Sequence, residues 1–414
     1  MVDKNLFLYD LAIVAIFKDE GHYLKEWLDY HLLAGVEHFY LYNNDSTDDY
    51  KEILAPYVEA NLVTLTDFPG KMMQYPAYED AIDKYRFDCR YMAFIDLDEF
   101  IFPKINRSIV EVVDEILSGV PNAAGLAINN QIYGSNGQET ADYSKGVLER
   151  FTRRAPIDWD GGNKGGNIFK KTIDNPRLIR YRRNPHFAEY FDEKFAVNSD
   201  KKYVLNAHYG SEPILIDKIV LNHYQTKSKE EFLLKQKKGR ADGNTLGLPM
   251  DIFYYNDRNE EFDDGILKYR AARADKFSFA DDNARINRVI NNLVRTLIAP
   301  KENLETFLTC RAVAEKFQIK IADNLAEEIA LALIYRTLKS AKLSRAETQM
   351  FLKALPEILS RPFPICAAIN DLAQNFIIPR FCEVLKNGDV VKGADDFKAH
   401  FNWLYVQKLL RLIK

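Results

Sequence analysis

The feature that most constrains the fold is a repeated alternation of apolar runs and amphipathic segments over residues 1–135. Residues 11–17, LAIVAIF, form an unbroken apolar run, which is typical of a strand buried on both faces of a parallel sheet. The large side chains of residues 24–32 then recur at helical spacing. Further strand-like runs follow at residues 38–42, 62–68 and 91–95, with a helix-like stretch at 77–90. This order predicts an α/β fold with a doubly wound, Rossmann-like sheet, because strand–helix–strand units connect parallel strands by right-handed crossovers.

Carboxylates stand directly after three of these apolar runs. Glu20 follows the first run, the segment 43–49 (NNDSTDD) follows the second, and Asp96, Asp98 and Glu99 follow the fourth. In doubly wound sheets, ligands bind at the carboxyl ends of the strands, so we expect these side chains to meet there. Gathered carboxylates repel one another unless a cation or hydrogen-bond donors compensate them. The site is therefore expected to hold a metal or a polyhydroxyl ligand, although turns and helix caps explain the segment 43–49 equally well.

The most specific pattern is Asp96-Leu97-Asp98. Two carboxylates at i and i+2 point to one side of an extended chain, so both can approach a hard divalent ion. Mg²⁺ or Mn²⁺ held there would clamp the diphosphate of a nucleotide-sugar and stabilise charge on the leaving nucleotide. Asp158 and Asp160 share this spacing but follow no apolar run. The strand before Asp96 is what favours it over that second pair.

Two other segments could bind phosphate. Residues 161–166, GGNKGG, could let backbone amides approach phosphate or sugar oxygens, but a plain flexible loop is the alternative, since neither GxGxxG nor a Walker loop is present. The cations that could neutralise phosphate are Lys227, Lys237, Lys238 and Arg240. A solvated helix face is the alternative interpretation of that cluster.

Glycine and tyrosine divide the chain. Of 19 glycines and 23 tyrosines, 17 and 21 respectively stand at or before residue 269. Beyond that point apolar residues recur at helical spacing over 286–297, and Ser344 with Glu347 forms a capping-box pattern. We therefore predict a sheet-containing domain over residues 1–280 and a C-terminal all-α helical domain over residues 281–414.

Charge and cysteine content exclude several classes of protein. The 56 basic and 60 acidic residues leave a net charge of −4, so the chain lacks the positive field that nucleic-acid binding requires. The cysteines are Cys89, Cys310, Cys366 and Cys382, without CxxC spacing; neither disulfides nor structural zinc are expected. No apolar run reaches the roughly 18 residues of a membrane span, and the first 20 residues lack a secretory pattern. We predict a cytoplasmic location.

Three motifs carry a resemblance to a known family. The segments AIFKDEGHYLKEWLDYHLLAGVEHFYLYNNDSTDD, YMAFIDLDEFIFP and NHYQTKSKEEFLLKQKKGRAD resemble glycosyltransferase family 92 and its bacterial relatives near family 2, over residues 10–245. The resemblance implies a GT-A fold, a UDP-sugar donor such as UDP-galactose, and Mn²⁺ or Mg²⁺. It further implies inverting transfer of a hexose to a glycan or lipid-linked acceptor, as in polysaccharide or lipopolysaccharide biosynthesis.

The resemblance also suggests roles for individual residues. The metal ligands would be Asp96, Asp98 and His223. The residues expected to bind the nucleotide-sugar are Glu20, Asp45, Asp96, Lys227 and Arg240. Glu99 would act toward the acceptor or behind the metal. For the base the sequence departs from the family 2 pattern, because no Glu-Asp pair follows the glycine-rich stretch; the residues considered for the base are Glu189, Asp192, Glu212 and Asp242, with Glu189 and Asp242 preferred. Independently of the resemblance, aromatic residues concentrate beside the proposed site, and the tyrosines proposed to contact sugar are Tyr75, Tyr78 and Tyr224.

Two alternative functions share parts of this pattern. A metal-dependent nucleotidyltransferase also uses a doubly wound sheet, but its N-terminal glycine-rich phosphate loop is absent from residues 11–20. A non-catalytic carbohydrate-binding protein could keep the fold without turnover. Residues 401–414 are apolar with three late cations and could touch an anionic membrane peripherally; a last helix docked on the helical domain is the preferred interpretation.

Overall fold

The computed structural model describes residues 7–274 apart from positions 87, 162–164, 192, 205–212 and 240–248. From Tyr9 on, these residues belong to one compact unit, Tyr9–Ala280. The predicted C-terminal helical domain lies outside the described residues, and the predicted boundary at residue 280 stays a prediction.

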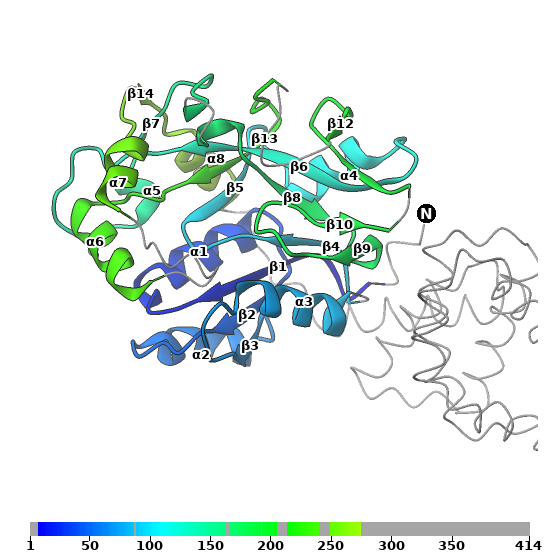
Figure 1. Cartoon of the computed structure of the whole chain (residues 1–414), viewed down its shortest axis with the longest axis horizontal. Coiled ribbons are helices and arrows are strands. Elements are labelled where there is room, and N and C mark those ends of the chain that lie inside the picture. The colour runs from blue at the N-terminus through cyan, green and yellow to red at the C-terminus, as the bar shows by residue number, and fades with distance from the viewer. Residues whose placement is uncertain are drawn as a thin grey trace, which may run out of the picture. The chain divides into compact units, whose positions relative to one another are not determined.

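The compact unit is built on a ten-stranded sheet (Figure 1). Its strands are β1 (Tyr9–Phe17), β2 (His38–Asn43), β3 (Val63–Asp67), β4 (Cys89–Phe94), β5 (Glu99–Pro103), β6 (Ala123–Ile132), β8 (Lys170–Asp174), β11 (Phe195–Val197), β12 (Tyr203–Val204) and β13 (Ile219–His223). The main order is β12-β11-β6-β8-β4-β1-β2-β3, and β13 pairs with both β5 and β6. Strands β1 to β4 run parallel to one another. The predicted α/β fold is thus confirmed as a mixed fold with a mostly parallel central sheet.

The sheet departs from the prediction at β8. This strand runs antiparallel between β4 and β6, whereas the sequence suggested only parallel strands. Its sequence, KKTID, is polar and carries none of the apolar continuity that identifies a buried strand. All five residues are nevertheless buried, with Lys171 paired to Asp96 and Glu99 and Asp174 paired to Arg182.

Eight helices are described, and they surround the sheet (Figure 1). They are α1 (Gly21–Leu33), α2 (Tyr50–Glu59), α3 (Gln74–Tyr85), α4 (Ile109–Leu117), α5 (Val147–Arg150), α6 (Lys229–Lys238), α7 (Met250–Asn256) and α8 (Gly265–Arg273). Two small sheets accompany them: β7 (Arg153–Arg154) with β14 (Glu261–Phe262), and β9 (Ile179–Tyr181) with β10 (Glu189–Tyr190). Within the described part of the chain, no helix is long and apolar enough to cross a membrane.

Helix α1 is locked to β5 through buried polar groups. Trp27 Nε1 donates to the carbonyl of Glu99 at 2.9 Å, and the amide of Ile101 donates to His31 Nε2 at 3.2 Å. Full burial lowers the pKa of His31 to about 3, so the ring is neutral and can accept that bond. These contacts fix the chain directly after β4, where the conspicuous carboxylates stand.

Candidate active site

A tight turn after β4 presents Asp96, Asp98 and Glu99. The amide of Glu99 donates to the carbonyl of Asp96 at 3.1 Å, and the amide of Asp96 donates to Glu99 Oε2 at 2.9 Å. The amide of Tyr224 donates to the carbonyl of Asp98 at 2.8 Å. Two hydrogen bonds within the turn and one from Tyr224, the residue after β13, therefore hold this turn in place at the carboxyl end of β4.

Three lysines from separate elements neutralise these carboxylates. Lys171 of β8 places Nζ 3.1 Å from Asp96 Oδ2 and 2.9 Å from Glu99 Oε2. Lys235 of α6 pairs with Asp98 Oδ2, and Lys227 Nζ lies 3.9 Å from the same oxygen. Sequence reasoning predicted Lys227 but missed Lys171 and Lys235. Lys235 begins the basic run that contains Lys237, Lys238 and Arg240, so a local signal for it exists. No neighbouring residue of Lys171 predicts a place in the cluster.

His223 completes the cluster through strand register. On β13 it pairs with Glu99 of β5, which places its Nε2 3.6 Å from Asp98 Oδ1 and its Nδ1 3.9 Å from Glu99 Oε1. The structure therefore brings His223 and Asp98 together, as the resemblance implied. Asp96 instead pairs with Lys171 and accepts from Gln74 Nε2 at 3.3 Å.

Burial and charge set the protonation states of the cluster. Burial alone would raise the pKa of Asp98, but Lys235, Lys227 and His223 outweigh it and hold that pKa well below its usual range. Burial raises the pKa of Glu99, reinforced by Asp96 and Asp98 against the opposing Lys171. Burial lowers the pKa of His223 to about 4 and that of Lys227 to about 8. At neutral pH, Asp98 is thus an anion beside a neutral imidazole.

Asp98 and His223 fit a divalent metal that is shared with a phosphate-bearing ligand. An ionised carboxylate and a neutral imidazole are the protonation states that bind metals, and His223 directs its Nε2 toward Asp98, 3.6 Å from Oδ1. No group of three His, Cys, Asp or Glu side chains within that same part of the chain is close enough to hold an ion alone. Mg²⁺ is usually held by one or two carboxylates plus substrate phosphates, so a partial protein site suits it.

The predicted nucleotide contacts lie at the neighbouring strand ends. Glu20 pairs with Lys238 Nζ at 2.9 Å, directly before α1. Asp45 is exposed and accepts from the amide of Gly70 at 3.1 Å. The carboxylate of Asp48 accepts from the amide of Gly21 at 2.7 Å, so part of the acidic segment caps α1 across the β1 and β2 ends. Asp48 therefore acts as a helix cap. Asp45 is exposed and could still contact a ligand.

The other predicted residues are exposed outside the main sheet, buried in the core, or outside the described residues. Glu189 is exposed on β10, which pairs with β9 outside the main sheet. The proposed sugar contacts Tyr78 and Tyr224 are wrong, because both side chains are fully buried; their phenol rings pack in the aromatic core. Arg240 and Asp242 lie outside the described residues.

Comparison with known proteins assigns the class. The sequence model described as glycosyltransferase family 92 matches residues 13–262, which is more than half of the chain. The chain therefore belongs to glycosyltransferase family 92, and the resemblance found in its motifs is confirmed.

Individual relatives match parts of this chain. A glycosyltransferase family 92 protein of Ricinus communis is 25% identical over 202 residues, covering 49% of this chain and 35% of the relative. Galactan beta-1,4-galactosyltransferase GALS3 of Arabidopsis thaliana is 30% identical over 195 residues, covering 45% of this chain and 33% of that protein. The chain thus spans about a third of the length of these relatives. The structure of S. aureus TarS 1–349 aligns with 84% of this chain and 86% of its own at 12% identity, with a TM-score of 0.31.

Proposed function

We propose that this chain is a metal-dependent hexosyltransferase that moves a hexose from a UDP-sugar to a glycan or lipid-linked acceptor with inversion. The observation that carries the proposal is the cluster of Asp98, His223, Lys227 and Lys235 at the carboxyl edge of the sheet, in a chain of glycosyltransferase family 92. The product would be a polysaccharide or lipooligosaccharide. Galactose is the proposed sugar, and its support is the name of the Arabidopsis relatives.

The cluster suits a diphosphate. Asp98 and His223 would hold Mn²⁺ or Mg²⁺, which supplies charge stabilisation to the departing nucleoside diphosphate when it is bound. Lys227 and Lys235 face Asp98 and would turn their ammonium groups toward phosphate oxygens once the donor is in place. Glu20 and Asp45, at the ends of β1 and β2, would accept hydrogen bonds from the nucleoside.

Glu99 is better suited to positioning than to proton transfer from the acceptor. A general base must come within hydrogen-bond reach of the acceptor hydroxyl, but the Glu99 side chain is only 2% exposed and already bonds Lys171 and the amide of Asp96. We therefore assign it to holding the turn. Glu189 and Asp242 remain the candidates for the base.

A β-linked product is proposed because the Arabidopsis relatives are named as beta-1,4-galactosyltransferases. The anomeric bond of UDP-galactose is α, so a β-linked product requires attack from the opposite face. Nuclear magnetic resonance of the newly formed anomeric signal tests this directly. A β-linkage agrees with the proposal, and an α-linkage contradicts inversion while leaving glycosyl transfer intact.

The reaction class is tested by a screen for nucleotide release. A panel of UDP-, GDP- and ADP-sugars is incubated with the protein and Mn²⁺, with EDTA as the metal-free control. We expect Mn²⁺-dependent UDP release that Asp98→Asn abolishes. Asp158→Asn makes the same change in the exposed second Asp-x-Asp pair and should retain activity. Absence of metal-dependent release with every donor, or full activity in Asp98→Asn, would overturn the proposal.

A further inference from the structure

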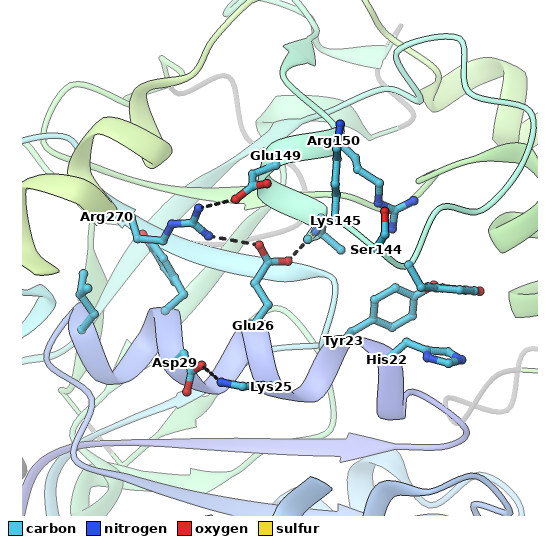
Figure 2. Close-up of a pocket in the computed structure, with 15 residues that line it drawn as sticks. His22, Tyr23, Lys25, Glu26, Asp29, Ser144, Lys145, Glu149, Arg150 and Arg270 are labelled. Atoms are coloured by element: carbon cyan, nitrogen blue, oxygen red, sulfur yellow. Dashed lines mark hydrogen bonds and ion pairs between the residues drawn. The ribbon is translucent and has the colours of Figure 1, made fainter.

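A cavity of about 450 Å³ lies along α1, beside the proposed donor site (Figure 2). One wall is the face of α1 that carries His22 and Leu33, and the other comprises residues 143–147, Glu149, Arg150 and Arg270 of α8. Its volume falls within the range of small-molecule sites. The proposed donor chemistry uses none of this space.

The walls of the pocket are fixed to each other. Glu26 of α1 accepts hydrogen bonds from the amides of Val147 and Leu148, and it pairs with Arg270 at 3.4 Å. Figure 2 shows Glu26 pointing from α1 toward both partners. A Cβ atom on Gly146 would collide with the Glu26 carboxylate, so a larger residue there would have to displace that side chain. The pocket is therefore built into the fold before any ligand binds.

One end of the pocket is aromatic. The rings of His22 and Tyr143 stack with centroids 4.1 Å apart and planes 18° apart, and the ring of Tyr23 lies 6.4 Å from that of Tyr143. Tyr143 is 43% exposed. A pyranose has an apolar C–H face that packs on such rings and a rim of hydroxyls that bonds polar side chains.

The charges that line the pocket compensate one another. Lys25 pairs with Asp29 on the outer face of α1. Arg270 bridges Glu26 and Glu149 (Figure 2). Arg150 is engaged by Glu231, outside the pocket, in a buried ion pair of 2.8 Å. The site thus offers many hydrogen-bonding groups with little net charge, which suits a neutral, hydroxyl-rich ligand better than an ionic one.

The aromatic end adjoins the proposed centre of transfer. Tyr23 donates its hydroxyl hydrogen to Glu231 Oε1 at 2.9 Å, and Lys227 Nζ lies 4.5 Å from the centre of the Tyr23 ring. Lys227 Nζ is in turn 3.9 Å from Asp98 Oδ2. Two side chains, Tyr23 and Lys227, therefore connect the pocket to the carboxylate proposed to bind the metal.

We infer that this pocket binds the acceptor, a neutral oligosaccharide, with its accepting residue against His22, Tyr23 and Tyr143 and its chain running along α1 toward Asp29. The lining from His22 to Leu33 spans roughly 17 Å at the rise of an α-helix, which is longer than one pyranose ring. The inference rests on the proposed function, because it assigns the second substrate of that reaction.

Steady-state kinetics with UDP-galactose and β-1,4-galactotriose test the inference. Tyr143→Ala and His22→Ala each remove one ring of the stacked pair, and each should raise the KM for galactotriose by about tenfold. The KM for UDP-galactose should change much less. Tyr203→Ala is the matched control, because Tyr203 is 55% exposed on β12, away from the pocket. An unchanged galactotriose KM in both ring variants would overturn the inference.

A binding measurement keeps the inference testable if no turnover is found. Saturation-transfer magnetic resonance detects galactotriose bound to the full chain in the presence of UDP and Mn²⁺. A signal from the wild type and Tyr203→Ala that disappears in both ring variants supports the pocket even if the proposed transfer fails. A signal that persists in both ring variants, or no signal from the wild type, contradicts it.

Discussion

The carboxylate of Glu231 should dominate the local stability of α6, the helix that carries Lys235 to Asp98. Both of its oxygens accept from Arg150 at 2.8 Å, and it completes the capping box with Ser228. Burial alone would raise its pKa, but Arg150 and Ser228 lower the pKa to about 2. Against the ordinary value of 4.5, this shift corresponds to about 3 kcal/mol of stabilisation at neutral pH.

Hydrogen exchange of the α6 amides measures that free energy locally. Glu231→Gln should speed exchange of Lys229–Lys238 by about 100-fold at pH 7, since each 1.4 kcal/mol is roughly a factor of ten. Because the folded pKa is depressed, the wild-type advantage is present above pH 4.5 and declines as pH falls toward 2. Glu59→Gln makes the same change at an exposed position of α2. Equal α6 exchange in Glu231→Gln and Glu59→Gln would refute this reasoning.

Three further predictions concern the lysines of the cluster. Lys235→Gln removes the cation that pairs with Asp98 and would compete with a metal for it. The affinity for Mn²⁺ without nucleotide, measured by electron paramagnetic resonance titration, should therefore rise by roughly tenfold. An unchanged affinity speaks against this competition. Burial lowers the pKa of Lys227 to about 8, so the lysine loses its charge as pH rises through 8. The affinity for UDP, measured by calorimetry, should fall over the same range. An affinity that stays constant up to pH 9 would exclude a charged Lys227 from the donor site. Lys171→Ala removes the cation that Asp96 and Glu99 share, and because burial already raises the pKa of Glu99, that carboxyl should then be protonated at pH 7. We expect the free energy of unfolding in urea titrations to fall by about 1–3 kcal/mol, the cost of leaving buried polar groups without their partner; an unchanged free energy of unfolding would refute this.

The strands and the turn after β4 were predictable because their signals are local. Apolar continuity located β1 and β4, and the i, i+2 spacing singled out Asp96 and Asp98. The structure adds that these two carboxylates have different partners, since Lys171 pairs with Asp96 and Lys235 with Asp98. That division depends on contacts across the fold.

The missed features depend on such long-range contacts. Lys171 reaches the cluster only because β8 inserts antiparallel between β4 and β6, and no pattern in KKTID announces that pairing. The pocket along α1 was missed because it depends on Glu26 bonding the amides of Val147 and Leu148. Tyr78 and Tyr224 are predicted to contact sugar from the concentration of tyrosines beside the proposed site, but both side chains are fully buried.

The most direct test of the central claim is mass spectrometry of galactotriose after incubation with UDP-galactose, Mn²⁺ and the full chain. The account predicts an oligosaccharide longer by one hexose with the wild type, and no product with Asp98→Asn or in the presence of EDTA. An equal yield from Asp98→Asn and wild type would contradict a transfer centre at Asp98.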